Sequence, residues 1–276
     1  MSTDFRELFK KHINSVVNKD PRNTPSNRLL GYDFEYVRDR ILLKGRADFN
    51  MAYIDHDGGA FVKYHRLEEE GYGPPLSPND IVLLYCYINL KSHFAEVSTI
   101  LGKQQATIEP LFSPDCKTLV IDFGCGPGTV CLALAERFKD KNFEYTGIDI
   151  APAMQQKANE LFIVAQEEQL ISKDCTAKFI SSWDEFNNEV IPSKSKVLLS
   201  FSYFFASNTL KESSLISLAA FVKTLRESEK IKEIKLLYIN SISIYAHKNY
   251  NKFVELINIK SKPEELGNFV YEIIPL

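Results

Sequence analysis

A glycine-rich turn directly after a short apolar run constrains the fold of this chain more than any other feature of its sequence. The run VIDF leads into Gly124-Cys-Gly126-Pro-Gly128, and the helix-type pattern VCLALAERF follows. Glycines at these three positions let backbone approach a ligand without intervening Cβ atoms, or serve tight packing alone. A dinucleotide fingerprint needs glycine where the chain has Thr129, and the Gly-Lys-Ser/Thr of a phosphate-binding loop is absent. The turn therefore matches neither of these types well.

Strand-like and helix-like runs alternate from about residue 113 onward. The strand-like runs are TLVIDF, FEYTGIDI, AKFISS, KVLLSFSYF and IKLLYINSISI. The helix-like runs are VCLALAERF, PAMQQKANELFIVAQEEQL, residues 208–228 and residues 247–258. This alternation predicts an α/β fold with a mostly parallel sheet and helices on both faces. Such a sheet binds ligands beyond the carboxyl ends of its strands, where the strand order reverses.

A second acidic position lies 21 residues after Gly128, where the run Tyr145-Thr-Gly-Ile ends in Asp149. A carboxylate there can accept hydrogen bonds from both hydroxyls of a ribose, although Asp149 alone could also cap the helix opened by Pro152. The glycine turn and Asp149 together resemble the first two motifs of class I S-adenosylmethionine-dependent methyltransferases. The resemblance implies a Rossmann-like sheet and S-adenosylmethionine as the cofactor.

The resemblance also implies roles for residues near these motifs. The family uses the position of Asp122 near the methionyl amino group, although Asp122 could simply bond turn amides. After the third strand, the family places a polar or acidic residue near the adenine amino group, which points to Asp184, with Ser182 and Trp183 beside it. Trp183 could equally stack on adenine or pack in the core. The predicted cofactor-binding set is Asp122, Gly124, Gly126, Gly128, Asp149, Ser182, Trp183 and Asp184.

The end of the fourth strand bears on the methyl acceptor. Family members that methylate exocyclic amines of nucleobases carry Asn/Asp-Pro-Pro-aromatic here, and the cytosine-C5 group carries Pro-Cys; neither occurs in this chain. Ser200, Ser202 and Tyr203 are the candidates to line the acceptor site, while Tyr203 could equally belong to the sheet core. Transfer from a sulfonium is an in-line displacement that depends on alignment and desolvation. No catalytic residue is therefore specified.

The chain is expected to divide near residue 112. Residues 1–112 would form a mainly helical extension and substrate lid, with a possible β-hairpin at 50–64, and residues 113–276 the methyltransferase domain. Amphipathic spacing predicts a helix over residues 3–18. Little room remains near the carboxyl end for the antiparallel strand pair that closes this fold. One edge strand is expected to be missing or to form around residues 256–261.

The expected extension contains polar residues that could serve other roles. Asp55, His56 and Asp57 could suggest a metal site, but the glycines that follow favour a hairpin turn, and no metal site is predicted. His65 and Arg66 follow and could reach the cofactor site.

The charge of the chain leaves the class of acceptor open. Its 33 basic and 36 acidic residues give a net charge of −3, with basic excesses at residues 1–46 and 223–262 and an acidic middle. These ends could meet the phosphates of an RNA or be solvated helix faces, so RNA and small molecules both remain candidate acceptors. No apolar run approaches the roughly 20 residues that span a bilayer, so no membrane partner is expected. The five cysteines form no CxxC pair, which favours a reducing, cytoplasmic setting. The oligomeric state is not indicated.

A second function remains compatible with the sequence: a non-catalytic methyltransferase-like module that acts as a scaffold for RNA, a ribosomal subunit or a protein partner. The order of YINLKSHFAEVSTIL, Pro110-Leu-Phe-Ser-Pro114 and GCGPGT is similar to methyltransferase-like proteins of small ribosomal subunit assembly, whose cysteine-rich metal-binding motifs are absent here. A glycine motif together with Asp149 favours a retained cofactor site, because a pure scaffold needs neither.

Overall fold

A computed structural model describes residues 1–19, 78–187, 191–207, 210–242 and 247–276 of the chain. The possible hairpin at 50–64, the turn at Asp55 to Asp57, and His65 and Arg66 all lie outside the described residues. All five cysteines lie within them, and none forms a disulfide. The described part contains no helix that is both long and apolar enough to cross a membrane.

In the part of the chain that the structure describes, seven strands form one sheet in the order β3-β2-β1-β4-β5-β7-β6. The first five strands are parallel, and β7 runs antiparallel to both of its neighbours. The strands are β1 Thr118–Phe123, β2 Glu144–Ile148, β3 Thr176–Ile180, β4 Ser195–Ser202, β5 Ile231–Ser241, β6 Glu264–Leu266 and β7 Phe269–Pro275. The chain order reverses between β1 and β4, which is where such a sheet binds its ligands. The expected Rossmann-like α/β sheet is confirmed.

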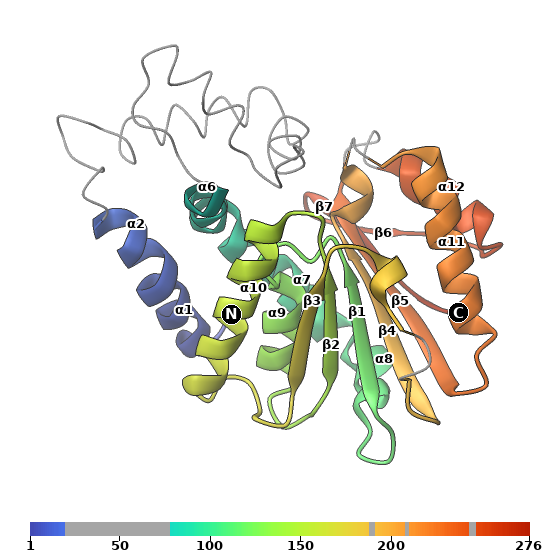
Figure 1. Ribbon diagram of the computed structural model, residues 1–276, viewed down its shortest axis with the longest axis horizontal. Helices are drawn as coiled ribbons and strands as arrows, with labels where there is room; N and C mark the ends of the chain where they lie inside the picture. Colours follow the sequence, from blue (N-terminus) through green and yellow to red (C-terminus); the bar gives the residue numbers. More distant parts are fainter. Residues whose placement is uncertain (20–77, 188–190, 208–209, 243–246) are drawn as a thin grey trace, which may run out of the picture.

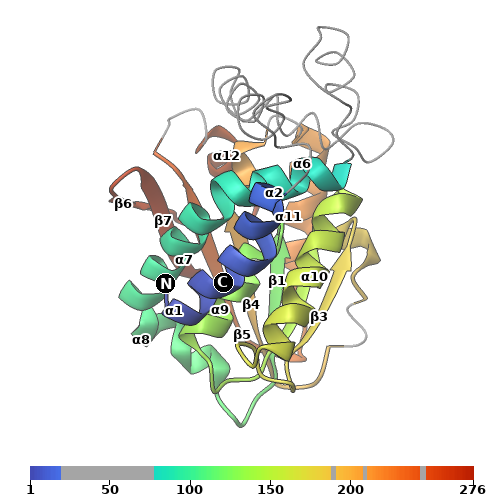
Figure 2. The same ribbon diagram turned by 90° about the vertical axis from the view of Figure 1, so that its left-hand side faces the viewer.

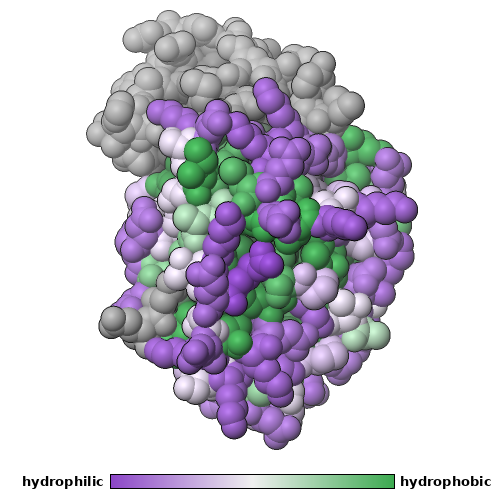
Figure 3. Space-filling model, turned by 90° about the vertical axis from the view of Figure 1, so that its right-hand side faces the viewer, coloured by the Kyte–Doolittle hydropathy of each residue, from purple (hydrophilic) through white to green (hydrophobic). Residues whose placement is uncertain are grey.

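Helices cover both faces of the sheet (Figure 1). On one face lie α9 Thr129–Arg137 and α10 Pro152–Glu167, and on the other lie α11 Glu212–Arg226 and α12 Lys248–Leu256. Side chains of β1 alternate between these layers: Val120 packs with α9 and α10, whereas Phe123 packs with α11 and α12. On the side where α11 and α12 lie, the surface shows an apolar area within hydrophilic surroundings (Figure 3).

The described parts of the first 112 residues are helical and pack outside α9 and α10 (Figure 2). Phe94 of this outer layer contacts Phe5 and Phe9, with ring centroids 5.2 Å apart in both pairs. These rings share one hydrophobic cluster with the helices of the sheet, although the division near residue 112 stays a prediction. The outer helices are α1 Thr3–Phe9, a π-helical turn Lys10–Asn14, α2 Ser15–Lys19, α6 Pro78–Tyr85, a second π-helical turn Cys86–Leu90, α7 Lys91–Lys103, α8 Gln105–Ile108 and a 3₁₀ turn Glu109–Phe112.

The closing strand pair is complete, so the expectation of a missing edge strand, or of one around residues 256–261, was wrong. Those residues end α12 and lead into the following loop, and Ile257 is buried in the core. β6 needs only three residues, because β7 pairs with β5 along its whole length and β6 pairs only with its first part. Gly267 turns the chain between them with a φ of 60°.

Candidate active site

The three glycines after β1 all adopt left-handed conformations, with φ values of 67° at Gly124, 52° at Gly126 and 79° at Gly128. A Cβ atom at Gly124 would lie 3.1 Å from the Phe204 ring, and one at Gly128 would lie 3.4 Å from Ala158 of α10. At Gly126 a Cβ atom would meet no atom of the described residues within 4 Å. Packing therefore accounts for Gly124 and Gly128, whereas the space in front of Gly126 is open to a ligand.

Asp149, at the end of β2, fastens this turn to the start of α10. Its Oδ2 accepts a hydrogen bond from the Gly126 N–H at 3.0 Å, and its Oδ1 accepts one from the Ala151 N–H at 2.9 Å. Gln155 of α10 donates to the Asp149 carbonyl oxygen at 2.5 Å. Burial raises the pKa of the Asp149 carboxyl, and the two N–H groups act in the opposite direction. Asp149 thus holds both the glycine turn and the backbone that leads into α10.

Asp122 lies in β1 with only 1% of its surface exposed. The Tyr145 hydroxyl donates to its Oδ2 at 2.5 Å, but its Oδ1 has no hydrogen-bond partner. Ser200 is the register neighbour of Asp122 on β4, and its buried Oγ is also without a partner. Burial raises the pKa of Asp122 to about 7. The hydroxyl groups of Tyr145 and Ser200 oppose this rise. The Ser200 hydroxyl does so by its proximity, because no hydrogen bond joins it to Asp122.

The segment after β3 is held by bonds among its own side chains. Ser182 Oγ accepts a hydrogen bond from the Asp184 N–H at 3.2 Å, while Glu185 Oε1 accepts from the Ser182 N–H at 3.0 Å, which makes a capping box. The Trp183 indole N–H donates to Ser217 Oγ of α11 at 3.0 Å. Asp184 is exposed, and the other two residues of the predicted set are partly buried. A role of Ser182, Trp183 and Asp184 toward adenine stays a prediction.

The end of β4 separates the three acceptor-site candidates. Ser200 is fully buried, whereas Ser202 and Tyr203 are partly buried. Tyr203 has a φ of 59°, a strained value for a residue other than glycine. Its hydroxyl donates to Glu96 Oε2 at 2.6 Å, and its ring stacks on His93 with centroids 4.5 Å apart. Glu96 and His93 were not predicted as site residues; their three-residue spacing on α7 was the only signal that could have indicated a shared face.

Residues 120–190 match a protein family whose description is "Methyltransferase domain". This segment runs from β1 through the glycine turn and Asp149 to the loop after the 3₁₀ turn at Trp183. The match covers this segment of the chain, and the strand order around it is the Rossmann-like order expected of a class I methyltransferase. No curated protein sequence matches the chain significantly.

Several solved structures share parts of this arrangement. The methyltransferase domain of bacterial CtHen1 is 16% identical, with 68% of this chain and all of that one covered and a TM-score of 0.44. A SAM-dependent methyltransferase from Aquifex aeolicus is 16% identical, covering 66% of this chain and 98% of that one, with a TM-score of 0.38. Magnesium protoporphyrin IX methyltransferase from Synechocystis, solved with bound SAM, is 14% identical, with 87% of this chain and 96% of that one covered and a TM-score of 0.39. Likenesses of this degree do not identify an acceptor.

Proposed function

We propose that the chain is an S-adenosylmethionine-dependent methyltransferase that transfers a methyl group by in-line displacement to an RNA or small-molecule acceptor. The observation that carries this proposal is the space that the described residues leave open in front of Gly126, whose N–H donates to the carboxylate of Asp149. The buried oxygens of Asp122 and Ser200 that lack hydrogen-bond partners support it. Buried polar atoms without partners are rare in folded proteins, and a polar ligand group would account for two of them at one place.

These residues suit the parts of S-adenosylmethionine. The backbone of the turn formed by Gly124, Gly126 and Gly128 would lie against the cofactor. Asp149 would accept hydrogen bonds from the ribose hydroxyls of the cofactor. Asp122 would face the amino-acid end, while the predicted segment of Ser182, Trp183 and Asp184 would lie near adenine. When bound, the cofactor supplies a methyl group on a positively charged sulfur, which departs as a neutral thioether.

The end of β4 supports an acceptor site formed with α7. Glu96 holds the Tyr203 hydroxyl and His93 holds its ring, so this strained residue has a fixed orientation at the carboxyl edge of the sheet. Ser202 is partly buried beside it. Ser200 is too deeply buried to contact a large acceptor. We therefore assign it to the neighbourhood of Asp122 and not to the acceptor site. The chain's contribution to transfer would then be to orient the acceptor and exclude water.

Calorimetric titration with S-adenosylmethionine and S-adenosylhomocysteine tests the cofactor. Asp149→Ala should weaken binding by about 1.5–3 kcal/mol, the scale for hydrogen bonds to a charged group. Because Asp149 also holds the glycine turn, the thermal unfolding of the variant must be measured together with its binding. Asp140→Ala, at an exposed aspartate, is the matched control. Well-folded protein that gives no heat with either ligand would contradict the proposal.

Incubation with methyl-labelled cofactor then tests the reaction. RNA and small-molecule fractions of a cell extract are offered separately, so that a labelled product identifies the class of acceptor. Cofactor binding without any labelled product favours the alternative of a non-catalytic binding module, and a labelled ribosomal RNA would support the similarity to ribosome-assembly proteins. The cytoplasmic setting stays a prediction in either case.

A further inference from the structure

We propose that Tyr145 and Ser200 are positioning residues that hold Asp122 as a buried counter-charge, so that capture of an ammonium group of the ligand releases one proton. The inference rests on the proposed function, because the ligand's ammonium is that of the cofactor's amino-acid end. It goes further by assigning roles to two side chains and by predicting proton exchange on binding.

The geometry of the three side chains carries this inference. Asp122 pairs in register with Gly147 of β2 and with Ser200 of β4, and the hydroxyl of Tyr145, two residues before Gly147, reaches its carboxylate. Only one of its carboxylate oxygens has a partner, the Tyr145 hydroxyl at 2.5 Å. The other oxygen and the Ser200 Oγ are buried and unpartnered. A cationic group with several N–H donors can satisfy a carboxylate oxygen and a hydroxyl oxygen together.

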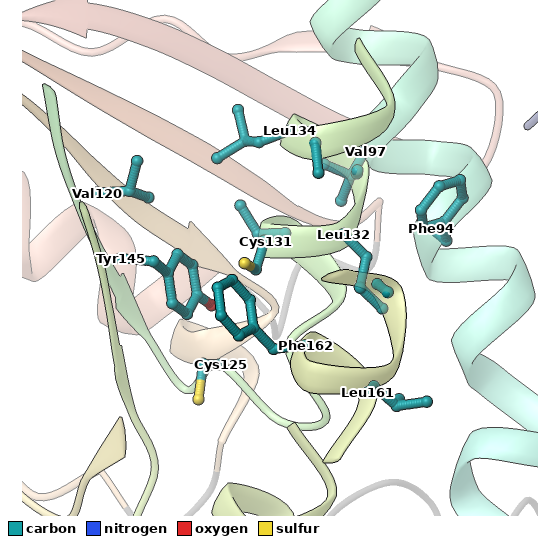
Figure 4. Packing of buried hydrophobic residues seen from close by; sticks show 14 of the residues in the cluster. Phe94, Val97, Val120, Cys125, Cys131, Leu132, Leu134, Tyr145, Leu161 and Phe162 are labelled. Atoms are coloured by element: carbon teal, nitrogen blue, oxygen red, sulfur yellow. The ribbon is translucent and has the colours of Figure 1, made fainter. Parts of the chain in front are cut away.

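The groups that face Asp122 do not compensate its charge. From β2 and its end come Tyr145 and Asp149, from the glycine turn Cys125, and from α9 Cys131. Figure 4 shows Tyr145 beside Phe162, with the two cysteines nearby. Burial raises the pKa of both cysteine thiols, so they stay neutral, and Asp149 is of the same sign as an ionised Asp122. Within the described residues, no cation forms an ion pair with Asp122.

The binding step follows from this environment. Without a ligand, the buried carboxyl group retains its proton up to about pH 7. When the ammonium approaches, the carboxylic O–H bond breaks, the proton goes to solvent, and the carboxylate pairs with the ammonium. The Tyr145 hydroxyl remains a donor to the carboxylate and stabilises its charged form. Affinity should therefore rise about tenfold per pH unit toward pH 7 and then level off.

Two commercially available ligands separate this effect from the rest of the site. S-adenosylhomocysteine carries the amino-acid end, whereas 5′-methylthioadenosine has the adenosine and thioether without it, so both would meet Asp149 and only the former would meet Asp122. Calorimetry at about pH 6 and pH 8, in buffers of different ionisation enthalpy, counts the protons released. The expected result is close to one additional proton with S-adenosylhomocysteine at pH 6 and close to none at pH 8.

Variants assign the effect to residues. Asp122→Asn should abolish the difference in proton release, and Tyr145→Phe should move the levelling of affinity upward by about one pH unit or more. Ser200→Ala should weaken S-adenosylhomocysteine several-fold and leave 5′-methylthioadenosine unchanged. Tyr271→Phe is the matched control for Tyr145→Phe, because Tyr271 is a buried tyrosine that donates to Glu264 at 2.5 Å, far along the sheet.

The outcomes distinguish this inference from the proposed function. Equal proton release with the two ligands, or a pH dependence that persists in folded Asp122→Asn protein, overturns the inference and leaves cofactor binding intact. An equal shift in Tyr145→Phe and Tyr271→Phe overturns the role of Tyr145. If neither ligand binds the folded wild-type chain, the proposed function itself fails. Thermal unfolding of each variant shows which proteins are folded, and Tyr145→Phe remains informative if Asp122→Asn is not.

Discussion

The two ends of the parallel strands differ in whether their buried polar groups have hydrogen-bond partners. At the amino ends, Lys196 donates to the Pro110 carbonyl oxygen at 2.5 Å and lies 3.8 Å from the carboxylate of Glu233. Lys235 lies 2.9 Å from the same carboxylate and donates to the Thr107 carbonyl oxygen. At the carboxyl ends, Asp122 and Ser200 keep oxygens without partners. Within the described residues, the buried side-chain nitrogen and oxygen atoms that lack a hydrogen-bond partner are confined to this second end. Complete pairing marks the end that fastens the outer helices, and incomplete pairing marks the end that is built for a ligand.

The largest effect is expected at the fastening end. Lys196→Ala removes a buried cation and leaves the Pro110 carbonyl of the 3₁₀ turn without this donor, so it should lower the free energy of unfolding by about 2–3 kcal/mol. Lys117→Ala is the control, because its ion pair with Glu144 is exposed and should contribute less than about 1 kcal/mol. Urea denaturation measures both. Equal losses would show that pairing at this end does not depend on burial.

A pH-dependent effect is expected at the ligand end. The folded-state pKa of Asp122 is raised to about 7, so its contribution to stability is present at low pH and is lost as pH rises from about 4 to 7. Asp122→Asn removes that loss. Relative to wild type, the variant should gain about 1–3 kcal/mol between pH 5 and pH 8 in denaturation experiments without ligand. The exposed Asp140→Asn is the control, and a variant whose relative stability is the same at both pH values would contradict a buried titrating carboxyl.

A matched pair of glycines sharpens the comparison. Gly126 and Gly267 have φ values of 52° and 60°, and among the residues that the structure describes a Cβ atom at either would meet nothing within 4 Å. Alanine at either position should therefore cost about 1–2 kcal/mol of stability from backbone strain alone. Only Gly126→Ala should also weaken S-adenosylhomocysteine, because its Cβ would enter the space assigned to the ligand. Equal affinities in the two variants would remove the support that Gly126 gives to the site.

The sequence was most informative where local chemistry decides the structure. A glycine turn after a β-type run and an acid at the end of the next strand could be predicted, because each depends on a few adjacent residues. The pairing of Tyr145 with Asp122 could not, because a tyrosine inside an apolar strand has the pattern of ordinary core. The β6 strand was also missed, since three residues with two glutamates carry no strand pattern and form only because β7 provides an edge.

Glu96 and His93 show the same limit at the acceptor side. Their meeting with Tyr203 depends on how α7 packs against the end of β4, more than 100 positions later in the chain. The position of Tyr203 was itself predictable from the end of the fourth strand. Its left-handed conformation was not, because tyrosine carries no local preference for it.

The smallest effect on stability is expected from Tyr203→Phe. The variant keeps the ring stacked on His93 and loses a partly buried hydrogen bond to Glu96, so it should cost about 0.5–1.5 kcal/mol. Its affinity for S-adenosylhomocysteine should match wild type, whereas labelled methyl transfer to the accepting fraction should fall. Glu96→Gln keeps an acceptor for the hydroxyl and should retain more transfer than Tyr203→Phe. If Tyr203→Phe transfers methyl groups at the wild-type rate, Tyr203 belongs to the packing between α7 and β4 and the acceptor lies elsewhere along this edge.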